Sequence, residues 1–116
     1  ITNNDKVQKK VAEERAKHLI NKVGLSEHMH KLPGQLSGGE CQRTAFVRAM
    51  INEPGLILAD EPTGSLDGDT ANILTDQLIE LNKEFETSLI VVTHSIKLAE
   101  KMQKIYHLID HHLQLK

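Results

Sequence analysis

An α/β fold is predicted by two short apolar runs set between segments of helical periodicity. The runs cover residues 56–59 and 88–93. Their length and aliphatic composition are typical of strands buried on both faces of a parallel sheet. Strand, helix, strand, helix and then a hairpin is an α/β order of elements. The sequence therefore predicts a sheet-based core with parallel strands.

Composition sets limits on the class of protein. The 116 residues are enough for one modest domain, and an aromatic content of 3% means that the core must be aliphatic. A net charge of −2 argues against a dedicated nucleic-acid binder. The single cysteine, Cys41, excludes an internal disulfide and fits a reducing compartment. The apolar runs are too short to cross a bilayer, and no signal peptide is expected. The start at Ile1, without methionine, suggests a piece of a longer or processed protein.

The first half of the chain is predicted to be helical. Apolar residues recur at helical spacing over residues 6–23, and Gly24 gives a stop. Residues 25–36 are expected to form a loop, in which His28 and His30 are interpreted as surface residues rather than metal ligands. A second helix is predicted over residues 37–52 by a capping box and an apolar stripe. These features consist of Ser37 and Glu40, and of Phe46, Val47, Met50 and Ile51.

The second half carries the strands. After the first strand, Asp67 is a suitable N-cap for a helix that runs to about residue 85. The expected buried face of this helix consists of Ile73, Leu74, Leu78, Leu81 and Phe85. A short helix over 96–102 and two edge strands, 105–109 and 113–115, complete the chain. We interpret residues 1–52 as a helical subdomain and 53–116 as part of the sheet-based core.

Charged residues gather where the predicted strands end. Asp60 and Glu61 follow the first strand, and His94 follows the second. Ligands of open α/β sheets bind at this edge, so one site could hold all three. An aspartate there can hold Mg²⁺, and a glutamate can activate water for attack on phosphorus. The alternative is a structural cap beside a solvated glutamate, which an isolated Asp-Glu pair would favour.

The start of the second helix is a candidate anion site. Ser37 adds a hydroxyl donor, and Gly38 and Gly39 let a ligand approach the backbone at the positive end of the helix. The alternative is an ordinary capped helix, which Ser-x-x-Glu alone would favour. The position of this motif just before the Asp60-Glu61 strand favours the functional interpretation.

Four motifs together resemble the ATPase domain of ABC transporters. Leu36-Ser37-Gly38-Gly39-Glu40 resembles the signature motif, and the strand into Asp60-Glu61 resembles the Walker B strand with its catalytic glutamate. Ser65-Leu66-Asp67 is similar to the D-loop and Thr93-His94 to the H-loop. The resemblance covers essentially the whole chain. The amino-acid sequence of residues 59–67 is most similar to that of the lipoprotein-release, macrolide-export and FtsE-like branch.

The resemblance implies a fold, partners and a location. The fold would be part of a P-loop NTPase (RecA-like) core, preceded by part of the ABC helical subdomain. ATP would lie between two such domains arranged head to tail. The partners would be this second ATP-binding domain and transmembrane transporter subunits, with no nucleic acid. The protein would be peripheral at the cytoplasmic face of the plasma membrane, and its ATP hydrolysis would drive transport, with lipoprotein release or export as the indicated branch.

The resemblance also implies roles for individual residues. Asp60 would position Mg²⁺, Glu61 would act as general base, and His94 would hold the γ-phosphate and the attacking water. The remaining residues would serve the ATP held by the partner or the dimer interface. They are Ser37, Gly38, Gly39 and Glu40 of the signature, Gln35 just before it, and Asp67.

Three departures from the family pattern stand out. No Gly-x-x-x-x-Gly-Lys loop is present, so Walker A is expected upstream of Ile1 and the 116 residues alone are expected to be inactive. Cys41 replaces the usual Gln, and Asp110-His111 replaces Asp-Gly, which predicts a looser or different turn.

Two other hypotheses about the function remain open. One is a soluble ABC-type ATPase of DNA repair, chromosome structure or translation, and the other a truncated interaction module without catalysis.

Overall fold

The computed structural model describes residues 3–116, so residues 1 and 2 of the predicted helical subdomain lie outside the described part. The long helices are α1 (Asn3–Lys22), α2 (Gly38–Met50) and α3 (Gly68–Glu84), and a short α4 spans Ile96–Glu100. The strands are β1 (Leu56–Asp60), β2 (Ser88–Val92), β3 (Tyr106–Ile109) and β4 (His112–Leu115). The predicted loop 25–36 contains two 3₁₀ turns, η1 (Ser26–His28) and η2 (Pro33–Gln35). The predicted order of helices and strands is confirmed.

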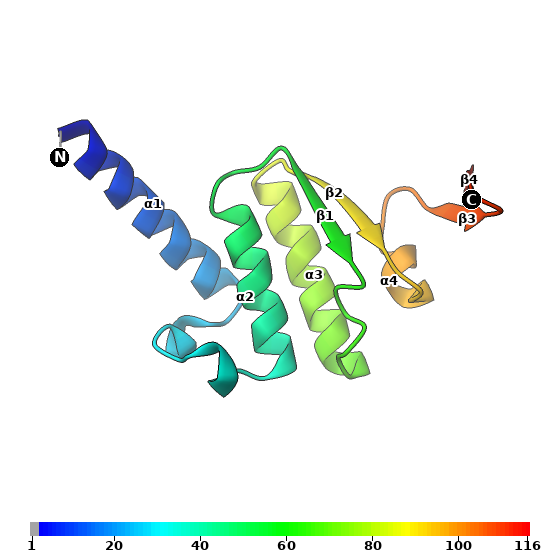
Figure 1. Ribbon diagram of the computed structural model, residues 1–116, viewed down its shortest axis with the longest axis horizontal. Coiled ribbons are helices and arrows are strands. Elements are labelled where there is room, and N and C mark those ends of the chain that lie inside the picture. The colour runs from blue at the N-terminus through cyan, green and yellow to red at the C-terminus, as the bar shows by residue number, and fades with distance from the viewer. Residues whose placement is uncertain (1–2) are drawn as a thin grey trace.

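Figure 1 shows α2 and α3 side by side, with the β1–β2 pair next to α3. One cluster of buried aliphatic side chains and Phe46 joins the end of α1, α2, β1 and α3. Its members are Leu19, Val23, Leu25, Phe46, Val47, Met50, Ile57, Leu74, Leu78 and Leu81. Since the cluster draws residues from both sides of position 52, helices and sheet share one core. The division at residue 52 stays a prediction.

The second half of α1 is fixed to this core. The guanidinium of Arg15 donates to the carbonyl of Ile51 at 2.7 Å and pairs with Glu53 at 3.0 Å. Toward the start of α1, Val7 and Val11 are 60% and 48% exposed. Figure 1 shows this part of α1 extending away from α2 and α3. The apolar spacing of α1 therefore predicts the helix but not its burial.

β1 and β2 form the predicted parallel pair, with Leu58 opposite Ile90 and Asp60 opposite Val92. The prediction that these two strands are buried on both faces is wrong for this structure. Ile57 is 6% exposed, whereas its neighbour Leu58 is 71% exposed. Successive side chains of a strand point to opposite faces, and the cluster that includes α3 residues covers only one of them.

α3 follows the prediction with one correction. Leu74, Leu78 and Leu81 are buried and Phe85 packs against the cluster, but Ile73 is 50% exposed. The core covers only the side of α3 that carries the three leucines. Ile73 lies on the flank of that side and is left half in water.

The C-terminal hairpin is antiparallel, with Leu108 opposite Leu113. Its turn residues Asp110 and His111 have φ values of 48° and 66°. Positive φ at both central residues is the pattern of a type I′ turn, so the expected change to a looser or different turn is wrong. All residues of β3 and β4 are exposed, and Figure 1 shows the hairpin beyond α4, away from α2 and α3. The radius of gyration of 16.2 Å accordingly exceeds the roughly 13 Å expected for a compact domain of this length.

Candidate functional site

The carboxyl ends of β1 and β2 lie at the same edge of the sheet. Asp60 ends β1 opposite Val92, the last residue of β2. Glu61 follows with a φ of 45°, and its N–H donates to the carbonyl of Val92 at 2.7 Å. This left-handed residue turns the chain out of the sheet and is an uncommon conformation for glutamate. Strained residues of this kind are frequent at functional sites.

The Glu61 carboxylate is held by the end of β2. One oxygen accepts the N–H of His94 at 2.7 Å, and the other accepts the hydroxyl of Thr93 at 3.1 Å. The imidazole Nε2 of His94 lies 3.8 Å from Glu61 Oε1, and this ring is fully exposed. The structure therefore brings together two of the three predicted strand-end residues. The role of Thr93 was missed, although its position directly before His94 was a usable signal.

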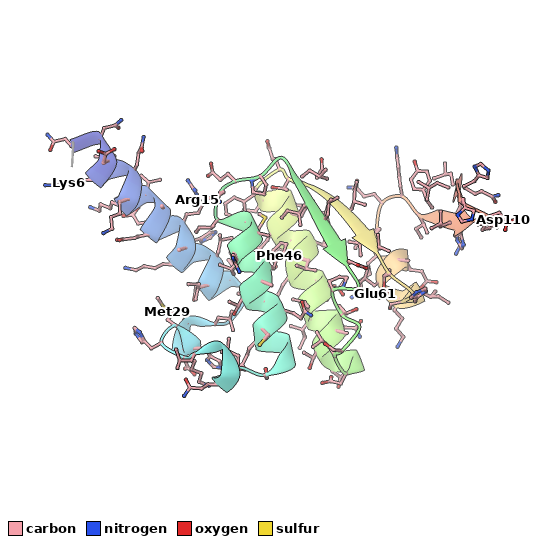
Figure 2. All side chains as sticks on the ribbon, viewed as in Figure 1. Lys6, Arg15, Met29, Phe46, Glu61 and Asp110 are labelled. Atoms are coloured by element: carbon pink, nitrogen blue, oxygen red, sulfur yellow. The ribbon has the colours of Figure 1, made fainter. Side chains whose placement is uncertain are left out.

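A recess of about 490 Å³ lies at this strand edge. Figure 2 labels Glu61 at the end of β1, near α4. The walls of the recess come from the turn after β1, the start of α3 and the segment from His94 into α4. They include Glu61, Thr63, Gly64, Gly68, His94 and Lys97. Asp60 and Ser37 do not line it, so the predicted residues fall into two groups.

The signature segment forms the second group. Ser37 is the N-cap of α2, and the predicted capping box is present. The hydroxyl of Ser37 accepts the N–H of Glu40 at 3.2 Å and donates to Glu40 Oε2 at 2.7 Å. The other Glu40 oxygen lies 2.7 Å from Nε2 of His28. The hydrogen bond from Ser37 lowers the pKa of Glu40 below its ordinary value of 4.5, and the nearby His28 and Lys31 act in the same direction.

Gly39 lies where α2 meets α3. A Cβ at this position would be 2.8 Å from the side-chain methyl of Thr70, whereas a Cβ on Gly38 would be 3.6 Å from Leu66. The lack of a side chain at Gly39 therefore permits close packing against α3. The sequence interpretation named only the approach of a ligand, so this packing role was missed.

Asp67 and Gln35 make contacts within their own segments. Asp67 caps α3, accepting the N–H of Thr70 at 2.9 Å and its hydroxyl at 2.8 Å. These bonds lower the pKa of Asp67 below its ordinary value of 3.8. The side-chain oxygen of Gln35 accepts the N–H of Leu32 at 2.9 Å, which closes the turn before α2. The predicted N-cap at Asp67 is confirmed.

The donor set fits a magnesium ion only in part. Among residues 3–116 no group of three or more His, Cys, Asp or Glu side chains could hold a metal ion. Asp60 is a single exposed carboxylate at the strand end. Mg²⁺ commonly takes one or two carboxylates and completes its shell with phosphate oxygens and water. Asp60 is compatible with a magnesium site of that kind.

No helix within residues 3–116 is long and apolar enough to cross a membrane. Cys41 is exposed, and its sulfur lies 3.9 Å from the carbonyl oxygen of Leu36. Cys41 does not line the recess.

Comparison with known proteins identifies relatives of this chain. Residues 1–64 match the family model described as ABC transporter. The lipoprotein-releasing system ATP-binding protein LolD of Hydrogenovibrio crunogenus is 49% identical over 106 residues, which are 91% of this chain and 46% of the relative. LolD of Pseudomonas fluorescens is 45% identical over 88% of this chain and 45% of the relative. The chain thus spans about half the length of these curated relatives.

Solved structures show the same likeness. A dimeric structure of MJ0796, a bacterial ABC transporter cassette, has a TM-score of 0.73 at 35% identity and covers 98% of this chain and 47% of its own. A post-hydrolysis state of that cassette, bound to ADP and Pi, has a TM-score of 0.74 at 33% identity over 100% of this chain and 48% of its own. The expected partial α/β fold with parallel strands is confirmed. With its family match, its relatives and its fold in agreement, this chain belongs to the ABC transporter family.

Proposed function

We propose that this chain supplies the part of an ABC transporter ATPase subunit that carries the signature helix, the Walker B carboxylates and the H-loop histidine. The observation that carries the proposal is the recess at the strand edge, where Glu61 and His94 meet. A carboxylate held in a fixed position beside an exposed imidazole can orient water and hydrogen-bond a phosphate. Relatives named as ATP-binding proteins support ATP as the nucleotide.

Glu61 is the proposed general base. The N–H of His94 and the hydroxyl of Thr93 fix its carboxylate, which can then accept a proton from water at the mouth of the recess. His94 is proposed to hold the γ-phosphate through its exposed ring. Asp60 is proposed to hold Mg²⁺, which when bound neutralises phosphate charge.

The signature group is proposed to act on the ATP of a second ATP-binding domain, in a head-to-tail dimer. Its proposed members are Gln35, Ser37, Gly38, Gly39 and Glu40, with Asp67 at the interface. Support comes from the separation of this group from the recess and from the dimeric structure of the MJ0796 cassette. The backbone N–H groups at the start of α2 and the Ser37 hydroxyl are suitable donors to phosphate.

The names of the relatives support a proposed cargo and proposed membrane partners. Since these are LolD proteins of lipoprotein-releasing systems, we propose lipoprotein release, with transmembrane subunits as partners at the cytoplasmic face of the plasma membrane. Residues 1–52 would be the helical part that meets those subunits. A longer cassette would also cover the bare sheet face, on which Leu58 and Ile90 are 71% and 53% exposed. Parallel sheets are normally covered on both faces.

The test uses a reconstituted cassette, in which this chain is joined to the preceding portion of the Hydrogenovibrio crunogenus relative, where Walker A is expected. Glu61→Gln should lower the turnover of ATP by about 10²–10⁴-fold, because the general base is lost, and should leave ATP binding intact. Phosphate release and binding of a fluorescent ATP analogue measure the two effects. Glu100→Gln, an exposed change on α4, is the control and should hydrolyse normally. Normal turnover by Glu61→Gln would remove Glu61 from the base role.

A further inference from the structure

The signature serine is part of a three-residue network that reaches back to the loop before α2. His28 Nε2 lies 2.7 Å from Glu40 Oε1. Glu40 Oε2 accepts the hydroxyl of Ser37 at 2.7 Å and its backbone N–H at 3.3 Å. The side chains of His28 and Glu40 are only 26% and 14% exposed. Each carboxylate oxygen of Glu40 thus has its own close partner, and only Oε2 accepts the Ser37 hydroxyl.

This arrangement conflicts with the proposed role of Ser37 unless another residue supports Glu40. A serine hydroxyl has one proton, and Ser37 gives it to Glu40 in this structure. To donate to a phosphate, the hydroxyl must turn away from Glu40. The half-buried carboxylate then loses a charge-assisted hydrogen bond, which is costly where water has little access. The donor that remains on the other oxygen is His28.

The position of the His28 ring suits this role. Its Nδ1 is buried and has no hydrogen-bond partner among the described residues. With a proton on Nε2, the ring can donate to Glu40 Oε1, which lies 2.7 Å away. Lys31 and Arg48 are the charged side chains that line the pocket beside His28. Both side chains only donate, so neither can accept a hydrogen bond from Nδ1 of His28.

We infer that His28 is a positioning residue of the signature motif: it holds the Glu40 carboxylate in place while the Ser37 hydroxyl moves from Glu40 to phosphate. The inference rests on the proposed function, since the phosphate belongs to the ATP of the partner domain. His28 itself does not touch the nucleotide.

The kinetic test uses the reconstituted cassette. His28→Ala should raise the KM for ATP by about tenfold. Without His28, Glu40 is left with no side-chain donor when the Ser37 hydroxyl turns to the phosphate. His28→Gln should restore most of the loss, since its amide can donate from about the position of Nε2. His30→Ala, an exposed histidine of the same loop, is the control and should leave KM unchanged. A KM within twofold of the wild type for His28→Ala would overturn the inference.

Two mutant backgrounds distinguish the inferred role of His28 from a purely structural one. In cassettes that already carry Ser37→Ala or Glu40→Gln, His28→Ala should not raise KM further, because the switch it supports no longer exists. If His28→Ala still raises KM about tenfold in both backgrounds, the residue acts on folding or packing and the inference is wrong. Urea unfolding of each variant shows which cassettes are folded.

A spectroscopic readout does not depend on ATPase activity. In the 116-residue chain, nitrogen NMR of the imidazole should show a proton on Nε2 of His28, and Glu40→Gln should shift both ring nitrogens. If the signals of the His28 ring nitrogens do not change in Glu40→Gln, the inference is wrong whatever the ATPase activity. If the rings respond but the wild-type cassette does not hydrolyse ATP, the proposed function fails, and with it the phosphate-bound step.

Discussion

The core around α2 and α3 and the C-terminal hairpin use the same kinds of side chain with opposite results. Leu74 of α3 is 1% exposed, whereas Leu108 and Leu113 of the hairpin are 72% and 69% exposed. α3 shares one buried cluster with α2 and β1, but the hairpin lies apart from them (Figure 1). Burial therefore depends on whether a second layer is present. Apolar residues in a segment do not by themselves bring about burial.

The same contrast occurs within one strand. Ile57 and Leu58 are adjacent and similar in size, yet one is buried in the cluster and the other is bare. Side chains that share the bare face, such as Ile90 and Val92, are also more than half exposed. The 116 residues therefore combine one well-packed core with sheet and hairpin faces that no layer of this chain covers within residues 3–116.

The sharpest test of this contrast is the same substitution made once in the core and once in the hairpin. Leu74→Ala should lower the free energy of unfolding by about 3 kcal/mol, because it leaves a cavity in the core. Leu113→Ala, the matched change in the hairpin, should lower it by less than about 0.5 kcal/mol. Urea denaturation followed by circular dichroism measures both. Equal losses would mean that the hairpin is packed in solution, and the contrast would be broken.

A smaller effect is expected where α2 meets α3. Gly39→Ala would place a methyl group 2.8 Å from the side chain of Thr70, so it should cost about 1 kcal/mol net of the better helix propensity of alanine. Thr70→Ser removes the clashing methyl and keeps the hydroxyl that bonds Asp67. The double variant should regain the lost stability. Gly38→Ala, with ordinary contact distances, is the control, and a loss there equal to that of Gly39→Ala would disprove the packing explanation.

The smallest expected effect concerns the two helix caps. The pKa values of Glu40 and Asp67 are lowered in the folded chain, so both carboxylates stabilise it at pH values above their ordinary values of 4.5 and 3.8. This stabilisation should be lost progressively as the pH falls below about 4.5 and through the lower folded values. Asp67→Asn keeps an acceptor oxygen but no charge, and should flatten the fall in unfolding free energy over this range. Urea midpoints at a series of pH values measure it, and an unchanged slope would argue against the Asp67 cap as a source.

The local signals in the sequence were sufficient for most of the fold. Ser37 and Glu40 indicated a capping box, and Asp67 indicated an N-cap, because a cap depends on residues three positions apart. The apolar runs indicated the two parallel strands. At the site, the pairing of Glu61 with His94 followed from the rule that parallel strands end at one edge.

Long-range contacts could not be read in the same way. No spacing in the sequence links His28 to Glu40, or Gly39 to the methyl of Thr70, because each pair is joined only when separate elements pack. The exposure of Ile73, Val7 and Leu58 likewise depends on which faces have a covering layer. The sequence by itself determined the helices, strands, caps and motifs, since these depend on neighbouring residues. Only the tertiary structure decided which faces are buried and which side chains support the signature serine, since both depend on how distant segments pack together.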